Sequence, residues 1–124
     1  MSPLAWVAFV VAGAVGAMLR YVVDTAVQAR VRGPFPWGTF VVNISGSFIL
    51  GVVTGLALYH AFPEEPRIVL ATGFCGAYTT FSTFTFETVR LLEQDATLEA
   101  CLNALGSLVS GAGAAALGLG LASL

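Results

Sequence analysis

The stretch Gly73-Phe74-Cys75-Gly76-Ala77-Tyr78-Thr79-Thr80-Phe81-Ser82-Thr83-Phe84-Thr85-Phe86-Glu87 decides the fold. Most of it belongs to an uncharged run, residues 68–86, whose 19 residues are long enough to cross the hydrocarbon core of a bilayer. Its glycines and its cluster of hydroxyl side chains nevertheless make a poor helix. Non-helical backbone at membrane depth is tolerated only where it is buried in protein or lines a cavity. The stretch therefore predicts a membrane-spanning helix with a break.

Three further uncharged runs flank this one, and they contain 17, 27 and 25 residues (3–19, 33–59 and 100–124). Charged residues make up only 10% of the chain, against about 25% in a soluble domain. Twelve charges cannot cover a soluble protein of this size, so the apolar surface must face lipid. We expect a single four-helix transmembrane domain, residues 1–124, in the plasma or inner membrane. Its predicted helices are 3–29, 37–61, 66–92 and 97–122.

Two other spans carry polar residues on one helical face. In the second predicted helix, Thr39, Asn43 and Ser47 are spaced four residues apart. In the fourth predicted helix, Asn103 and Ser107 have the same spacing. Polar side chains in a span usually face protein or water. For Asn43, a functional role and interhelical packing are equally acceptable interpretations, whereas for the fourth helix taken alone packing is favoured.

Small residues also recur at four-residue intervals, as in the pair Gly51 and Gly55 and the pair Ala114 and Gly118. In lipid such residues let helix backbones approach closely. The pattern predicts tight packing within the bundle and also suggests an oligomer.

Phe81 and Phe84 lie three residues apart, so a helical turn places their rings side by side. An aromatic ring has a positive edge, which can contact an anion. Hydroxyl and amide donors can replace part of the anion's water shell, and no Lys or Arg lies at mid-span to hold it tightly. Neutral ligands of this kind favour rapid release, which conduction requires.

Several other classes of protein are not indicated. Cys75 and Cys101 both lie inside spans without other metal-ligating residues, so we infer no disulfide and no metal site from them. A net charge of −2 does not suggest nucleic-acid binding. No nucleophile and base are paired, and we expect no enzymatic activity.

Four stretches of the sequence resemble the Fluc (CrcB-like) fluoride ion channel family: Gly16–Tyr21, Gly38–Phe48, Gly73–Gly76 and Thr79–Phe84. The resemblance covers essentially the whole chain. It implies a fluoride-selective channel that exports fluoride passively from the cytoplasm. It also implies a dual-topology homodimer with antiparallel subunits and two pores. The small excess of arginine in the first and third loops over the second is compatible with insertion in both orientations.

The resemblance also assigns roles to individual residues. Residues implied to lie along the fluoride pathway are Asn43, Phe81, Phe84, Ser82, Thr83, Asn103 and Ser107. Main-chain carbonyls of Gly76 and Thr79 correspond to those that hold a structural sodium ion at the dimer centre. Arg20 corresponds to an arginine near the end of the family's first helix. The chain departs from the family pattern at Ala77, where many members have glycine, and at Gly111, which leaves one step of the fourth-helix polar track without a side chain.

Two other classes of membrane protein compete with this interpretation. A small multidrug-type, proton-coupled exporter also has four helices, but it needs a carboxylate buried in a span. Asp24 can pair with Arg20 one turn away, and we interpret Glu87 as an interfacial residue near Arg90. A non-transporting assembly subunit or holin-like protein would not need the polar chemistry of Asn43 and of the third span.

Overall fold

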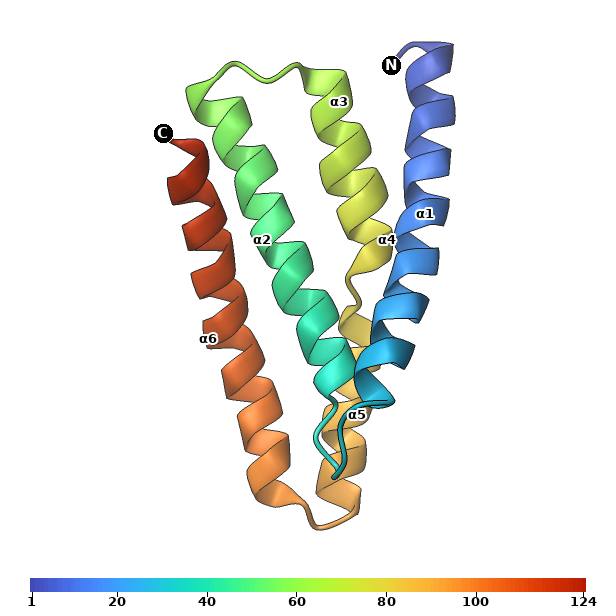
Figure 1. The fold of residues 1–124 in the computed structure, drawn as a ribbon, viewed down its shortest axis with the longest axis vertical. Coiled ribbons are helices and arrows are strands. Elements are labelled where there is room, and N and C mark those ends of the chain that lie inside the picture. Colours follow the sequence, from blue (N-terminus) through green and yellow to red (C-terminus); the bar gives the residue numbers. More distant parts are fainter.

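The computed structural model describes residues 1–124, and every regular element is helical (Figure 1). The elements are α1 (Pro3–Gln28), α2 (Trp37–Tyr59), α3 (Glu64–Ile68), the π-helical η1 (Val69–Cys75), α4 (Gly76–Tyr78), α5 (Phe81–Glu93) and α6 (Thr97–Ala122). By length and composition, α1, α2 and α6 can each cross a membrane, with mean hydropathies of 1.9, 1.9 and 1.6. The predicted all-α fold is confirmed.

Residues 64–93 form the remaining helical stretch, which is interrupted. Here α3, η1 and α4 continue one another as far as Tyr78, and α5 begins at Phe81 (Figure 1). The predicted break is confirmed, and it lies at the two residues between these elements. Gly73 and Gly76, which we expected to weaken the helix, remain helical.

The ends of α2 are set by contacts and backbone geometry that the sequence pattern does not reveal. Pro36, the residue before α2, offers no side-chain cap, and Gln28 of α1 instead accepts a hydrogen bond of 2.9 Å from the Gly38 N–H. The helix ends at Tyr59, two residues earlier than predicted. Ala61 has φ +52°, a left-handed conformation that cannot continue a right-handed helix.

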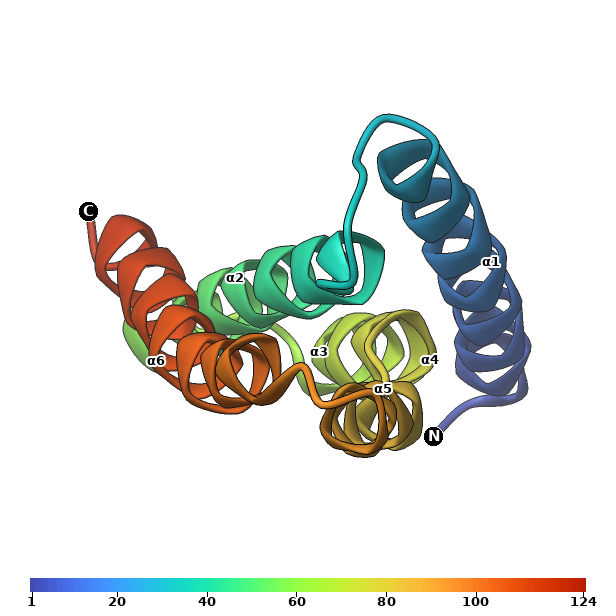
Figure 2. The same cartoon turned by 90° about the horizontal axis from the view of Figure 1, so that it is seen from below.

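The helices pack with α2 at the centre. α6 lies along one side of α2, whereas α1 and the stretch from α3 to α4 lie on the other, and α5 packs against α6 (Figure 2). Both ends of the chain lie at the same end of the molecule, next to the turn between α2 and α3 (Figure 1). This arrangement places the break between α1 and α2, near the middle of the long axis.

Small residues bring α2 and α6 into close contact. A Cβ atom at Gly51 would collide with the carbonyl oxygen of Ala115, and one at Gly118 would collide with the carbonyl oxygen of Phe48. The predicted tight packing is confirmed for this helix pair. Gly16 has the same role in α1, because a Cβ there would lie 2.5 Å from the carbonyl oxygen of Phe74.

The exterior is mostly apolar. Only 18 of the 124 residues are buried, and large hydrophobic side chains such as Leu4, Met18 and Leu108 are more than two-thirds exposed. A soluble monomer rarely exposes so much contiguous apolar surface, whereas lipid tails solvate it. The chain is a multi-pass membrane protein.

Candidate functional site at the helix break

Two threonines form the break. Thr79 has φ −80° and ψ 160°, and Thr80 has φ −145° and ψ 123°, so the backbone of both is extended. The carbonyl oxygen of Cys75 accepts hydrogen bonds from the N–H (2.9 Å) and the hydroxyl (2.8 Å) of Thr79, where α4 ends. The hydroxyl of Thr80 accepts from the Thr83 N–H at 3.2 Å and caps α5. One threonine thus ends a helix and the next begins another.

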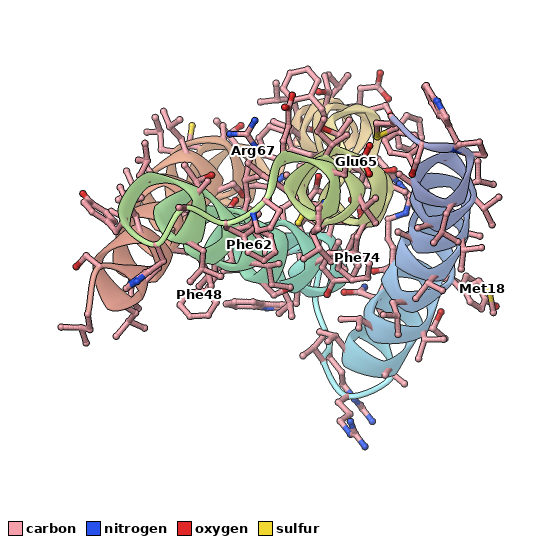
Figure 3. All side chains as sticks on the ribbon, turned by 90° about the horizontal axis from the view of Figure 1, so that it is seen from above. Met18, Phe48, Phe62, Glu65, Arg67 and Phe74 are labelled. Carbon is pink, nitrogen blue, oxygen red and sulfur yellow. The ribbon has the colours of Figure 1, made fainter.

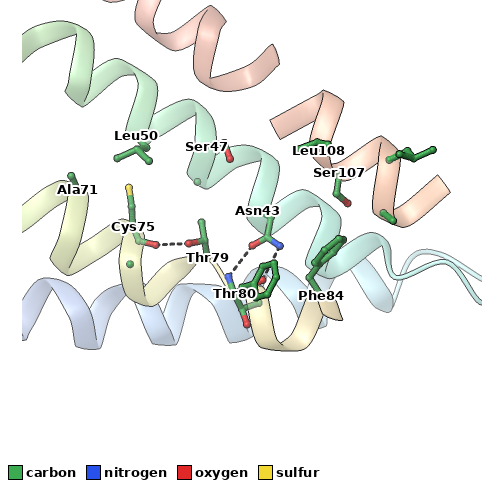
Figure 4. A pocket seen from close by; sticks show the side chains of 15 residues that line it. Asn43, Ser47, Leu50, Ala71, Cys75, Thr79, Thr80, Phe84, Ser107 and Leu108 are labelled. Carbon is green, nitrogen blue, oxygen red and sulfur yellow. Dashed lines mark hydrogen bonds between the residues drawn. The ribbon is translucent and has the colours of Figure 1, made fainter. Parts of the chain in front are cut away.

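The amide of Asn43, on α2, pairs with the main chain of the break. Its Oδ1 accepts from the Thr80 N–H at 2.9 Å, and its Nδ2 donates to the Thr80 carbonyl at 3.0 Å (Figure 4). Main-chain groups at membrane depth must find partners inside the protein. Asn43 supplies both partners, so its two hydrogen bonds to Thr80 stabilise the break. The second N–H of the Asn43 amide remains available as a donor.

A groove with a volume of about 690 Å³ runs along the break. It lies between α2, α6 and the stretch from η1 to α5 (Figure 4). The residues that line it are Asn43, Gly46, Ser47, Leu50, Ala71, Cys75, Gly76, Thr79, Thr80, Phe81, Phe84, Ala104, Leu105, Ser107 and Leu108. None of them carries a formal charge, so a ligand in this groove would meet only neutral amide and hydroxyl groups, ring edges and aliphatic walls.

Phe81 and Phe84 lie next to each other at this groove, as their spacing predicts. Their ring centroids are 6.0 Å apart and their planes are inclined by 46°. The side chain of Phe84 is half-buried, whereas that of Phe81 is 78% exposed. A tilted pair of this kind can present ring edges to the same small volume, and a ring edge carries partial positive charge.

The fourth-helix residues Asn103 and Ser107 lie in different environments. Ser107 lines the groove, but Asn103 is fully buried and does not. The Ser107 hydroxyl donates to Asn103 Oδ1 at 3.3 Å, and Asn103 Nδ2 donates to the Thr88 hydroxyl at 2.8 Å. Thr88 in turn donates to the carbonyl oxygen of Phe84 at 2.8 Å. Asn103 therefore joins α6 to α5 beneath the groove.

A second, smaller pocket of about 190 Å³ lies on the other side of the break, between α1 and α2. Arg20, Asp24, Thr39 and Thr83 are among its lining residues. This Arg20 pocket, unlike the groove, contains charged groups. Ser82 lines neither space and its side chain is exposed. The structure thus brings Asn43, Phe81, Phe84 and Ser107 together but places Thr83, Ser82 and Asn103 elsewhere.

Gly76 and Thr79, the predicted sodium ligands, both line the groove. Gly76 is exposed, and a Cβ there would meet nothing within 4 Å. The space beside this part of the main chain is therefore open, and carbonyl oxygens are the ligand type that a hard cation prefers.

Comparison with known proteins gives a match over most of the chain. A sequence profile described as "CrcB-like protein, Camphor Resistance (CrcB)" matches residues 7–119. The chain belongs to the CrcB family. The resemblance inferred from the sequence is therefore confirmed.

Relatives within the CrcB family are similar over nearly their whole length. Over all 124 residues the chain is 47% identical to "Fluoride-specific ion channel FluC 1" of Leifsonia xyli subsp. xyli, 90% of which is covered. It is 45% identical over 114 residues to the protein of that name in Streptomyces avermitilis, with 92% of each chain covered. It is also 47% identical over 122 residues to the Frankia casuarinae protein, with 94% of this chain and 95% of the relative covered.

Three features of this CrcB-family site were not found from the sequence. One is the pairing of Asn43 with Thr80, and another is the buried contact between Asn103 and Thr88. The third is a hydrogen bond of 2.5 Å from the buried Thr39 hydroxyl to Glu87 Oε1, which holds the half-buried Glu87 against α2. The only signal for these contacts was the presence of amides and hydroxyls within apolar runs, which does not identify their partners.

Proposed function

We propose that the chain is a fluoride-selective channel through which fluoride leaves the cytoplasm passively, without coupling to another gradient. The observation that carries this proposal is the uncharged groove at the helix break, where the Phe81 and Phe84 rings lie beside the Asn43 amide and the Ser107 hydroxyl. The names of relatives at 45–47% identity, which are fluoride-specific channels, support the same conclusion.

The chemistry of the groove suits brief, weak binding of a small anion. A fluoride ion that sheds water needs replacement donors, and the free N–H of Asn43 and the hydroxyl of Ser47 can provide them. The edges of Phe81 and Phe84 add electrostatic attraction without a full charge. Because no arginine or lysine lines the groove, the ion is not held tightly, and it can move on.

Passive export is a sufficient defence against fluoride. Hydrogen fluoride enters as a neutral acid and dissociates at cytoplasmic pH, which traps the anion. A membrane potential that is negative inside favours the exit of a monovalent anion by about 2.3 kcal/mol per 100 mV. A selective path alone therefore lowers the internal concentration.

The working unit in this proposal is an antiparallel, dual-topology homodimer of four-span subunits. Residues 64–93 provide the third span, with the break at mid-membrane. The groove of a single chain is open on one side, with Phe81 78% exposed beside it, and this supports a working unit in which a second copy covers that side. The few arginines near the helix ends give only a weak orientation signal, which supports insertion in both directions.

Sodium is proposed as a structural ion at the centre of this dimer. Main-chain carbonyls of Gly76 and Thr79 would hold it, and their place beside open space fits that role. A single chain supplies too few oxygen ligands for such an ion, since hard cations take about six. The ion would therefore stabilise the assembly and take no part in moving fluoride.

Purified protein in liposomes tests the function directly. Vesicles loaded with potassium fluoride are diluted into fluoride-free buffer with valinomycin, and a fluoride electrode records release. The controls are vesicles without protein and vesicles loaded with potassium chloride, whose release is recorded with a chloride electrode. We expect rapid release of fluoride and almost none of chloride. Equal release of the two anions would rule out a selective channel.

The same vesicles distinguish the channel from a proton-coupled exporter. An exporter would need a titrating carboxylate such as Glu87, and its flux would follow an imposed pH gradient. A channel's fluoride release should follow the membrane potential set by potassium and valinomycin instead. Release that stops without a proton gradient would favour the exporter.

A further inference from the structure

A separate pocket of about 270 Å³ lies at the end of the molecule that carries the turn between α2 and α3. We call it the Arg67 pocket. Its lining residues are Thr54, Ala57, Leu58, Arg67, Ile68, Ala71 and Thr72. It shares only Ala71 with the groove, and it contains none of the residues proposed to contact fluoride. Its chemistry therefore needs its own explanation.

The polar groups of the Arg67 pocket have no partners within the protein. Thr54 and Thr72 are exposed, and their hydroxyls make no hydrogen bond, although Thr85 and Thr88 each donate to the carbonyl four residues back at 2.8 Å. Arg67 is also exposed, and its guanidinium group makes no hydrogen bond within the chain. A guanidinium group and two hydroxyls in one pocket form a set of free donors.

No carboxylate neutralises this set of donors from within the pocket. Glu65 projects to the opposite side of α3 from Arg67 (Figure 3). There it accepts hydrogen bonds from the N–H (2.9 Å) and the hydroxyl (3.4 Å) of Ser2. Glu64 is the other acid of α3 and lies one turn before Arg67, but it does not line the pocket. The pocket itself carries one positive charge and no negative one.

The Arg67 end of the pocket lies near the end of α2 and the start of α3, where the headgroups of a bilayer are expected. α2 ends close by at Tyr59, whose side chain is exposed, and tyrosine is enriched at the membrane interface. The aliphatic side chains of Ala57, Leu58 and Ile68 line the pocket near the level of Arg67, and Thr54 and Thr72 lie about one helical turn further from the α2–α3 end. A ligand that fits this space has a negative head and an apolar body.

We propose that the Arg67 pocket binds the phosphate group of an anionic phospholipid. Arg67 and the hydroxyls of Thr54 and Thr72 donate to the phosphate oxygens, and the aliphatic wall contacts the glycerol end of an acyl chain. Arginine suits phosphate because its planar fork donates two parallel hydrogen bonds. A zwitterionic headgroup fits less well, because its cation finds no carboxylate in the pocket. This proposal depends on insertion in a membrane and not on fluoride transport.

Native mass spectrometry of the purified full-length protein in detergent tests the proposal. The probe is phosphatidylglycerol, with phosphatidylcholine as the zwitterionic comparison. Arg67→Gln should weaken phosphatidylglycerol binding by about tenfold or more, since charge-assisted hydrogen bonds to phosphate are lost. The matched control is Arg32→Gln, which removes the same charge from the exposed loop after α1, outside the pocket.

Further variants keep the result interpretable if Arg67→Gln folds poorly. The double variant Thr54→Val with Thr72→Val retains the charge and should also weaken binding, whereas Glu64→Gln should strengthen it by removing a nearby negative charge. Inorganic phosphate alone should not compete at concentrations similar to those of the lipid, because it lacks the apolar body.

Four outcomes would overturn the proposal. One is equal phosphatidylglycerol affinity in Arg67→Gln and Arg32→Gln proteins, and another is equal affinity of the unaltered protein for both lipids. A third is displacement of the lipid by inorganic phosphate at similar concentrations, which would assign the site to a soluble anion. The fourth is no lipid binding at all, which would indicate that a second copy of the chain covers the pocket.

Discussion

Replacement of Asn43 by alanine tests whether this amide stabilises the break or acts mainly on the ion. The substitution removes the partners of both the N–H and the carbonyl of Thr80. Interhelical hydrogen bonds between side chains in membranes average only about 0.6 kcal/mol, because the unfolded chain finds other partners in the bilayer. The Asn43–Thr80 hydrogen bonds differ from that average case, because they involve main-chain groups. At the break, the N–H and carbonyl of Thr80 have no main-chain partner within a helix that could replace Asn43.

The expected magnitude follows from the number of groups left unpaired. Each buried main-chain group without a partner costs about 1–3 kcal/mol. The groove beside Thr80 is open, and water entering it would compensate part of this cost. We therefore expect Asn43→Ala to lower the free energy of unfolding by about 2 kcal/mol, which changes the folding equilibrium roughly thirtyfold.

The measurement is a titration with sodium dodecyl sulfate, followed by circular dichroism, of protein in detergent micelles. Ser47→Ala is the control, because Ser47 lies one turn further along the same face of α2 and also lines the groove. Its hydroxyl makes no hydrogen bond within the chain, so its loss should change stability by less than about 0.5 kcal/mol. If Asn43→Ala reduces fluoride flux but is as stable as Ser47→Ala, the amide acts on the ion and our structural reasoning is wrong.

Three further predictions concern the groove and the packing beneath it. Phe84→Ile keeps an apolar side chain but removes the ring edge, so fluoride efflux from liposomes should fall while the protein stays folded; unchanged efflux would exclude ring-edge contact with the ion. Gly51→Ala should strongly reduce the yield of folded protein on size-exclusion chromatography, because the new Cβ collides with the main chain of α6. Gly113→Ala is the control and should be tolerated, because a Cβ at that position would meet nothing within 4 Å. Equal yields of the two variants would contradict the packing of α2 against α6. Asn103→Leu should lower the free energy of unfolding by about 1–3 kcal/mol, because the fully buried amide joins α6 to α5; a variant as stable as the unaltered protein would show that this link is dispensable.

The sequence predicted which polar residues share a face of one helix, but it did not predict which residues of other helices they contact. The four-residue spacing placed Thr39, Asn43 and Ser47 on one face, but only Asn43 and Ser47 line the groove, because Thr39 lines the Arg20 pocket and donates to Glu87. The same reasoning placed Asn103 and Ser107 together, yet only Ser107 reaches the groove, because α6 turns Asn103 into the contact with α5. Thr83 follows Phe81 by two residues and therefore faces the Arg20 pocket on the other side of the break.

The sequence alone determined that this chain is a helical membrane protein with an interrupted third segment. Length and polarity are local properties, and a bilayer selects apolar runs of about 20 residues whatever else the chain does. Only the tertiary structure decided that the break falls at Thr79 and Thr80, where Asn43, 37 residues away from Thr80, takes the place of the missing helical partners. Such a pairing depends on how α2 is rotated and how closely it approaches the break, and neither quantity is contained in the spacing of residues along one helix.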